Sequence, residues 1–161
     1  MSRYSIVKIT KKNRQKVEQI IEDNWISTDV YISDNKLVDC RQVDGFVACD
    51  GGNILGVITY IMYDKICEIV TLNSLESNKG IGTALCNELI EYAKKNNCKF
   101  IKVITTNDNL NALKFYQKRG FCLKEIFPNA LEYVRKKKSI PLIGENNIPL
   151  RDTIELEMVL C

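Results

Sequence analysis

Two stretches of the sequence combine residue types and spacings that could do chemistry, and the first is SNKGIGT at residues 77–83. Gly80 and Gly82 stand directly before ALCNELIEYAKK, whose apolar residues have helical spacing. The start of a helix exposes unpaired backbone N–H groups and the positive end of the helix dipole, which bind phosphate oxygens. The same spacing also suits a plain tight turn. Because Leu85 stands where a third glycine would be, the stretch is not a complete dinucleotide motif, and it lacks the G-K-[ST] of a Walker loop.

The second stretch is TTNDNLNALKFYQKRGF at residues 105–121. Asn109, Ala112 and Tyr116 recur near one face of a helix that Gly120 ends. Tyr116 is one of the side chains that could take part in proton transfer, with an unperturbed pKa of about 10. Alternatively, Tyr116 is a core aromatic residue with its hydroxyl at the rim, since aromatic residues at helical spacing usually serve packing.

The inventory of reactive side chains narrows the chemistry. The sequence contains no histidine, which excludes Ser-His, Cys-His and His-zinc mechanisms and leaves proton transfer to Asp, Glu, Tyr, Lys or Cys. Seven cysteines form no C-x-x-C pair and are odd in number, which argues against a disulfide framework and against a zinc site. We therefore expect reduced thiols that pack as small hydrophobes, and no metal.

Charge and length indicate the class of protein. The 23 basic and 20 acidic side chains are mixed along the chain and leave a net charge of +3, so we expect no nucleic-acid partner. The run RKKK at 135–138 is more typical of a solvated face. No apolar stretch is long enough to cross a membrane, and the first residues do not resemble a signal peptide. We expect a cytoplasmic protein with one domain over residues 1–161, without membrane contact.

The periodicity of apolar residues predicts an α/β arrangement with a mixed central sheet. A helix that Thr10 caps and that runs to about Trp25 follows the first strand, and a turn at Gly51-Gly52 joins two antiparallel strands. Residues 25–44 have no clear pattern, and residues 128–152 suggest a helical turn followed by a loop or an extra hairpin. The predicted strands are 4–9, 45–50, 54–63, 65–75, 100–105, 121–127 and 153–160, and the predicted later helices are 80–97 and 111–119.

Taken together, these features resemble the GNAT superfamily of acyl-CoA-dependent N-acyltransferases. The resemblance rests on a strand with an acidic residue (CEIVTL, 67–72), the loop SNKGIG (77–82) and N-x-x-A-x-x-x-Y-x-x-x-G-F (109–121), in that order. The tail from residue 140 looks like a bacterial branch of the family whose acceptors are mostly unassigned. The resemblance implies a mostly antiparallel central sheet of six to seven strands, flanked by helices and splayed in the middle to form an acyl-CoA cleft.

The resemblance also implies which residues bind acetyl-CoA. Near Leu72 and Ser74 the strand would splay and pair with the pantetheine arm, and the Leu72 N–H would stabilise an oxyanion. Asn109 would hydrogen-bond the cofactor near this arm, and Tyr116 would lie beside the sulfur. The CoA pyrophosphate would bind the backbone amides of Lys79, Gly80, Ile81, Gly82 and Thr83.

One position departs from the family pattern. Ser77 stands three residues before the first glycine, where these proteins usually have Arg or Gln. Because the loop acts mainly through backbone N–H groups, we expect weaker pyrophosphate binding rather than none, with Lys79 as a partial substitute for the missing charge.

The reaction implied is transfer of an acetyl group to a primary amine by direct attack in a ternary complex. Tyr116 would be the acid, and Glu68 would be the base through a water molecule. Glu68 could equally be a solvated strand residue or a partner for a lysine. The rival from another class is a non-catalytic acyl-CoA-binding sensor with the same fold.

The acceptor, a small-molecule or peptide amine, is not specified by the sequence. We expect residues 25–44 and 128–152 to wall its site, with aromatic and acidic candidates in both segments. A homodimer could form through the alternating final strand. The acceptor-side candidates are Trp25, Tyr31, Tyr133, Glu132, Glu145 and Asp152.

Overall fold

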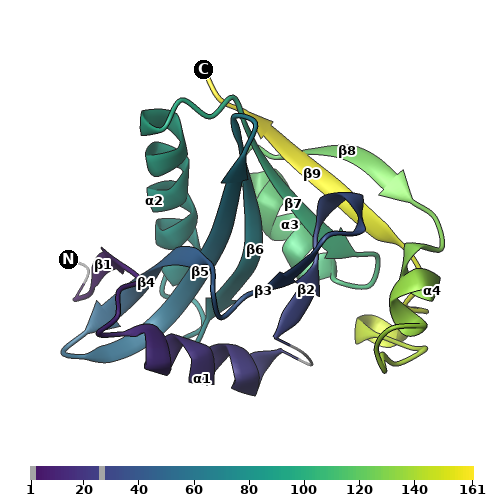
Figure 1. Ribbon diagram of the computed structural model, residues 1–161, viewed down its shortest axis with the longest axis horizontal. Coiled ribbons are helices and arrows are strands. Elements are labelled where there is room, and N and C mark those ends of the chain that lie inside the picture. Colours follow the sequence, from purple (N-terminus) through teal and green to yellow (C-terminus); the bar gives the residue numbers. More distant parts are fainter. Residues whose placement is uncertain (1–2, 26–27) are drawn as a thin grey trace.

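The computed structural model describes residues 3–25 and 28–161, which fold around a seven-stranded mixed sheet (Figure 1). The strand order is β1-β4-β5-β6-β7-β9-β8, and every neighbouring pair is antiparallel except β6 and β7. This confirms the predicted fold class. The sheet strands are β1 (Ser5–Lys8), β4 (Asp44–Asp50), β5 (Asn53–Tyr63), β6 (Ile66–Ser74), β7 (Phe100–Thr106), β8 (Cys122–Phe127) and β9 (Thr153–Val159).

The remaining elements cover the two faces of the sheet. Helices α2 (Ile81–Lys95) and α3 (Leu110–Lys118) pack on one face around a core that includes Leu85, Leu89 and Tyr116. Helix α1 (Arg14–Asn24) and the separate hairpin β2–β3 (Asp29–Tyr31, Leu37–Asp39) cover the other face, with Val17, Ile21 and Val38 in a second core. Figure 1 shows the hairpin crossing in front of the sheet and α4 (Ala130–Arg135) beyond its tip.

Two sequence-based predictions need correction. Helix α1 begins at Arg14 after an Asn13 N-cap, because residues 10–13 form a preceding turn in which the Thr10 N–H donates to Asn13 Oδ1 over 2.7 Å. Thr10 therefore starts a turn and does not cap the helix. The final strand β9 cannot pair across a dimer, because β7 and β8 occupy both of its edges. The free edges of the sheet are β1 and β8.

The parallel pair at the centre of the sheet is short. Strand β6 pairs with β7 only over Ile66–Ile69 against Phe100–Val103, although both strands continue for several residues. An irregularity in the β5–β6 pairing lies at the same level, because Thr59 pairs with Thr71 while Tyr60 pairs with Ile69. The extra residue, Val70, bends β6 away from β7. The sheet therefore splays where the sequence predicted it.

Two glycines place the start of α2 against this splayed end. A side chain at Gly56 of β5 would lie 2.6 Å from Ile81 Cγ2, so only glycine allows the first turn of α2 to approach the sheet this closely. Gly80, the N-cap of α2, has a φ of 70°, which glycine adopts without strain. The first N–H groups of α2 consequently stand beside the end of β6.

Candidate active site

The splay frees one edge of β6. The N–H groups of Leu75 and Thr71 both point toward β5, where they donate to Leu55 O over 2.8 Å and to Thr59 Oγ1 over 3.1 Å. Because backbone N–H groups alternate along a strand, those of Leu72 and Ser74 point the opposite way, toward the gap that β7 has left. This is the orientation that pairing with a pantetheine arm and oxyanion stabilisation by Leu72 require.

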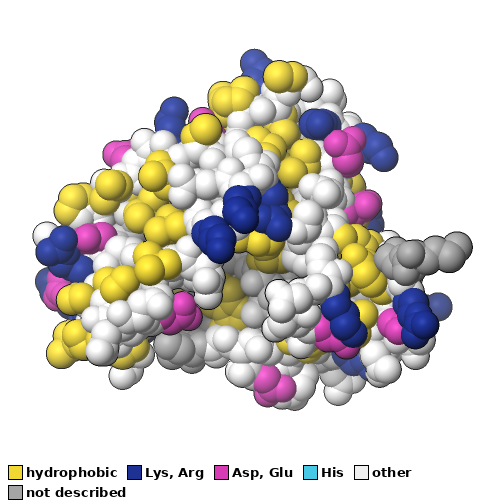
Figure 2. Space-filling model, turned by 180° about the vertical axis from the view of Figure 1, so that it is seen from behind, with side chains coloured by type: hydrophobic (Ala, Val, Ile, Leu, Met, Phe, Trp, Pro, Cys, Tyr) yellow, Lys and Arg dark blue, Asp and Glu magenta, His cyan; other side chains and the backbone are white. Residues whose placement is uncertain are grey.

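The glycine loop is open to solvent. Residues 77–80 are exposed, and α2 begins at Ile81. The Ile81 side chain is buried in the core, so this residue offers only its backbone to a ligand. Figure 2 shows the face that carries α2 and α3, with a hollow near its middle, hydrophobic atoms inside the hollow and Lys and Arg side chains beside it. The loop thus presents unpaired amides, as a diphosphate site requires.

The side chains around the loop contribute less than predicted. Lys79 Nζ lies 2.5 Å from Glu76 Oε2, so its charge is neutralised by a neighbour within the loop. Glu76 accordingly raises the pKa of Lys79 above its ordinary value. Ser74 Oγ donates to Glu76 O over 2.8 Å and is taken up by the same turn. Lys79 is therefore a poor substitute for the basic residue that the family pattern has in place of Ser77.

The Asn109 side chain caps the start of α3. Its Oδ1 accepts a hydrogen bond from the Ala112 N–H over 3.0 Å, which caps the helix. The side-chain carbonyl is thus occupied, and only Nδ2 is available to donate to a ligand. The predicted contact between Asn109 and the cofactor depends on this amide.

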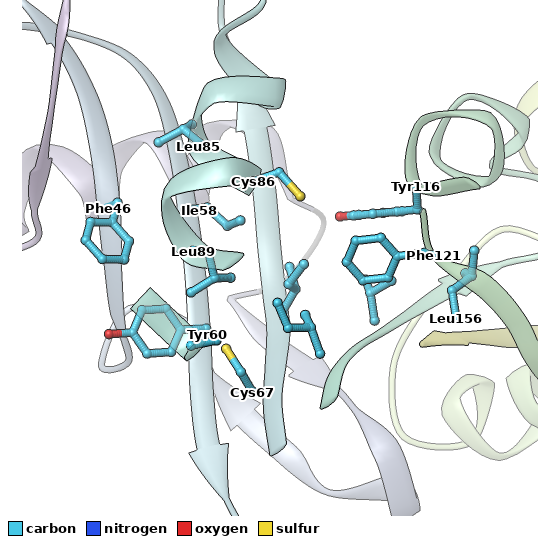
Figure 3. Close-up of a cluster of buried hydrophobic side chains, with 14 of the residues drawn as sticks. Phe46, Ile58, Tyr60, Cys67, Leu85, Cys86, Leu89, Tyr116, Phe121 and Leu156 are labelled. Atoms are coloured by element: carbon cyan, nitrogen blue, oxygen red, sulfur yellow. The ribbon is translucent and has the colours of Figure 1, made fainter. Parts of the chain in front are cut away.

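Tyr116 lies in the core between α2 and α3, and only 5% of the residue is exposed. Phe115 and Phe121 flank its ring, each with a centroid separation of 5.2 Å. Figure 3 shows the hydroxyl pointing toward Cys86 of α2. Burial raises the pKa of Tyr116 above its ordinary value, so the pKa near 10 used in the sequence-based argument is too low. The phenol stays protonated and is better suited to donate a hydrogen bond than to release its proton.

Glu68 is not solvated, in contrast to one of the sequence-based alternatives. It is fully buried in β6, and three donors satisfy its carboxylate. The Ser33 N–H and Oγ donate to Oε1 over 2.9 and 2.8 Å, and Tyr63 Oη donates to Oε2 over 2.6 Å. Burial, followed by the hydrogen bond to Glu68, raises the pKa of Tyr63. The carboxylate is therefore held in place by the tip of the β2–β3 hairpin.

A second buried acid adjoins this cluster. Ser33 Oγ also lies 3.2 Å from Glu155 Oε1, and Lys102 Nζ lies 3.6 Å from the same oxygen. A hydroxyl carries one proton, so Ser33 can donate to only one of the two carboxylates at a time. Lys102 and Glu68 are register partners on β7 and β6, immediately before the splay. The cluster thus lies at the mouth of the splay, on the side of the sheet that faces the hairpin.

The two predicted catalytic side chains stand on opposite faces of the sheet. Tyr116 belongs to the core under α2 and α3, whereas Glu68 contacts the hairpin on the other face. The structure therefore does not bring them together directly. Groups from the two faces could meet in the gap between β6 and β7.

The predicted acceptor walls do contact one another. The rings of Tyr31 and Tyr133 meet edge to face at 5.9 Å, and Lys138 Nζ donates to Asp29 O and lies 5.3 Å from the centre of the Tyr31 ring. Trp25 Nε1 donates to Asn73 Oδ1 over 2.7 Å, which ties the end of α1 to the splayed part of β6. The described parts of the two irregular segments thus contact each other through the hairpin.

The acidic candidates in these segments are less available to bind an amine. Glu132 pairs with Arg135, and Asp152 lies 2.9 Å from Arg151 Nε. Glu145 is exposed, and its backbone N–H donates to Asp108 Oδ2. Two cations of the 135–138 run are also engaged, since Arg135 bonds to the carbonyls of Pro141 and Leu150 and Lys138 bonds to the hairpin. That run is part of the fold rather than a free basic patch.

Sequence reasoning missed several residues of the site. Ser33 and Tyr63 hold Glu68, and Glu155 lies beside them. Alternation in the last strand places Glu155 on the face opposite Leu156, which was a usable signal. Ser33 gave none, because it lies in a segment without periodicity. Arg119, which reaches the start of α2, stands four residues after Phe115, a spacing that predicts contact on a helix.

Two cavities lie outside the candidate site. Two shallow cavities of about 350 and 330 Å³ lie beside Tyr60 and Tyr92 and beside Lys65 and Asn97, away from the splay. Over residues 3–25 and 28–161, we find neither a cluster of His, Cys, Asp or Glu that could hold a metal ion nor a helix that could span a membrane.

The fold is that of the GNAT type, and sequence comparison agrees. The family model described as "Acetyltransferase (GNAT) family" matches residues 13–121, so the chain belongs to this family. The uncharacterized protein YxbD of Bacillus subtilis (strain 168) is 45% identical over 142 residues, which cover 87% of this chain and 89% of that protein.

Solved structures have the same architecture. The IAA acetyltransferase from Bacillus cereus ATCC 14579 matches with a TM-score of 0.69 and 26% identity, covering 98% of this chain and 99% of the other. A GNAT family acetyltransferase from Elizabethkingia anophelis, solved with acetyl-CoA bound, matches with a TM-score of 0.70 and 22% identity over 99% of this chain and 100% of the other. At this identity the second similarity establishes the fold alone.

Proposed function

We propose that this chain transfers an acetyl group from acetyl-CoA to a primary amine by direct attack in a ternary complex. The observation that carries the proposal is the splay of β6 from β7 beside the exposed loop 77–80 that leads into α2. The diphosphate of acetyl-CoA binds the backbone amides of residues 79–83, and the pantetheine arm pairs with Leu72 and Ser74. The thioester then lies at the gap between the two faces of the sheet.

Each reacting group has a candidate partner on one side of the gap. The Leu72 N–H stabilises the oxyanion that forms when the amine attacks the carbonyl carbon. Tyr116 donates a hydrogen bond to the departing CoA sulfur from the α2–α3 face, and Asn109 Nδ2 bonds to the arm. Glu68 accepts the proton from the amine through water, from the hairpin face. Much of the rate acceleration comes from holding the amine against the thioester.

A second function is favoured by the state of Glu68. Its carboxylate is fully buried and its oxygens are taken up by Ser33 and Tyr63, so an amine cannot reach it while the hairpin tip stays in place. A protein that binds acyl-CoA without turnover would tolerate this arrangement. The sensor therefore remains the alternative to the enzyme.

A turnover screen separates these functions. The protein is incubated with acetyl-CoA and a panel that contains a polyamine, an aminoglycoside, free amino acids and lysine peptides, and thiol release is followed. Acetylated product must be confirmed by mass. We expect at least one amine to raise thiol release well above hydrolysis. Binding of acetyl-CoA by calorimetry without product from any amine would support the sensor, and absence of binding would contradict both functions.

A further inference from the structure

Arg119 connects the end of α3 to the start of α2. It is the C-cap residue of α3, yet its Nε lies 3.1 Å from Thr83 Oγ1, and Nη2 donates to the same oxygen. Nη1 donates to Phe115 O over 2.8 Å, and the guanidinium lies 3.6 Å from the centre of the Phe115 ring. The group is therefore fixed in one orientation beside the first turn of α2.

Arg119 lies close to the glycine loop. A Cβ atom at Gly82 would lie 3.4 Å from Phe115 Cε2. The Phe115 ring, on which the Arg119 guanidinium stacks, therefore also packs against the glycine loop. Thr83 Oγ1 accepts hydrogen bonds from two nitrogens of Arg119, which leaves its own proton for another acceptor. Arg119 thus turns the Thr83 hydroxyl into a donor at the position where the helix amides are exposed.

The charge of Arg119 is not neutralised by a carboxylate. Among the ion pairs of the part of the chain that the structure describes, none includes Arg119, whereas Lys79 is paired with Glu76. A guanidinium has five N–H donors, and Thr83 and Phe115 engage three of them. The other two belong to the terminal nitrogens, which match the oxygens of a phosphate group.

We propose that Arg119 and Thr83 form the side-chain part of the diphosphate site, and that Arg119 supplies the positive charge that Ser77 does not provide. The inference rests on the proposed binding of acetyl-CoA at the α2 loop. It adds an anion-binding pair from two different helices to a site otherwise built from backbone amides. The positive end of α2 and the guanidinium then act on the same diphosphate.

The test compares ligands with and without the diphosphate. In the Arg119→Met variant, which keeps an apolar side chain over Phe115, we expect the Kd for CoA measured by calorimetry to rise at least tenfold. The Kd for 3′-dephospho-CoA should rise by the same factor, because the diphosphate is retained in that ligand. Thr83→Val should raise both values three- to tenfold. The matched control Lys95→Met, at the far end of α2, should change them less than twofold.

A purely structural role for Arg119 predicts different effects on kcat/KM. If Arg119 only fastened α3 to α2, Arg119→Met would lower kcat/KM for S-acetylpantetheine, which has no diphosphate, as much as for acetyl-CoA. We expect kcat/KM for S-acetylpantetheine to change less than twofold. An unchanged Kd for CoA in both variants, or a penalty that disappears with 3′-dephospho-CoA, would overturn the proposal. Failure of the wild-type protein to bind CoA would instead count against the proposed function itself.

Discussion

The two halves of the candidate site are built in different ways. On the α2–α3 face, the acetyl-CoA half consists of backbone N–H groups that the splay and the Gly80 turn leave exposed, with few specific side chains. On the hairpin face, the proposed acceptor half contains the buried carboxylate of Glu68, which already accepts hydrogen bonds from Ser33 and Tyr63. The donor half is open to its ligand, whereas the acceptor half is closed by a segment of the chain itself.

The difference between the two halves determines which of the two substrates needs a rearrangement of the chain. In the proposed function, acetyl-CoA binds backbone groups that need no rearrangement. An amine would reach Glu68 only if the tip of the β2–β3 hairpin releases the carboxylate, because Glu68 is fully buried and three donors already bind it. Substitutions at the diphosphate loop should therefore act on cofactor affinity, and substitutions in the acceptor half should act on turnover and stability.

The strongest test of the comparison is Gly82→Glu. The new carboxylate would stand against the diphosphate, and like charges in contact cost several kcal/mol. We expect the Kd for acetyl-CoA to rise about 100-fold or more. The matched control is Asn87→Glu, which adds the same charge on an exposed position of the same helix and should leave the Kd within twofold. Retained binding in Gly82→Glu would mean that the loop does not hold the diphosphate.

Tyr116→Phe should affect turnover and spare affinity. Loss of one hydrogen bond to the leaving sulfur should lower kcat about 10- to 100-fold, with the Kd for acetyl-CoA unchanged within twofold. Steady-state kinetics and calorimetry on the same preparation measure both quantities. Tyr4→Phe, on the other side of the same core, serves as the control and should retain full turnover. Wild-type turnover in Tyr116→Phe would remove the phenol from the mechanism.

The same variant tests the burial of the phenol through pH. Because the folded-state pKa of Tyr116 is raised, the folded protein disfavours the phenolate. The resulting stability is present below the unfolded pKa of about 10 and is lost as the pH rises above it. Melting temperatures measured from pH 8 to 11 should therefore fall less in Tyr116→Phe than in the wild type. An identical fall in both proteins would mean that the hydroxyl is solvated.

Glu68→Gln, in the acceptor half, should also lower turnover and spare affinity, but it should in addition lower the stability of the fold. The neutral amide oxygen can still accept a hydrogen bond from Ser33, but Tyr63 loses its charged acceptor. Hydrogen bonds to charged groups contribute about 1.5–3 kcal/mol. We expect a loss of unfolding free energy of about 1–3 kcal/mol and a roughly tenfold lower kcat, with acetyl-CoA affinity intact. Chemical denaturation and amine kinetics provide the readouts. Unaltered kcat in a folded Glu68→Gln protein would leave Glu68 with a purely structural role.

The contrast between the two halves also explains what the sequence could predict. Backbone sites depend on a short local pattern, and the glycines at 80 and 82 correctly predicted the start of α2, where we propose the donor half. The site made by Ser33, Tyr63 and Glu68 joins residues 35 positions apart through a hairpin that has no periodicity, so no local pattern indicates it. Its hydrogen bonds follow from tertiary packing alone.

The same reasoning applies to the errors. Thr10 has the residue type of an N-cap, but Asn13 reaches back to it and moves the helix start by one turn. The alternating pattern of residues 153–160 indicated a strand and one apolar face, and neither feature tells whether its edges are free. Strand order decided that point, because β9 lies between β7 and β8.

Ser33→Ala is the mildest test, and it addresses the hairpin directly. The variant removes one neutral hydroxyl donor and keeps the Ser33 backbone N–H, so the unfolding free energy should fall by about 1 kcal/mol. Because one contact that closes the acceptor half is lost, the amine KM should fall severalfold while the Kd for acetyl-CoA stays constant. Ser139→Ala, at an exposed position, is the matched control and should change neither quantity. A higher amine KM would show that Ser33 helps to bind the acceptor, and the hairpin tip would then be part of the acceptor site rather than a barrier to it.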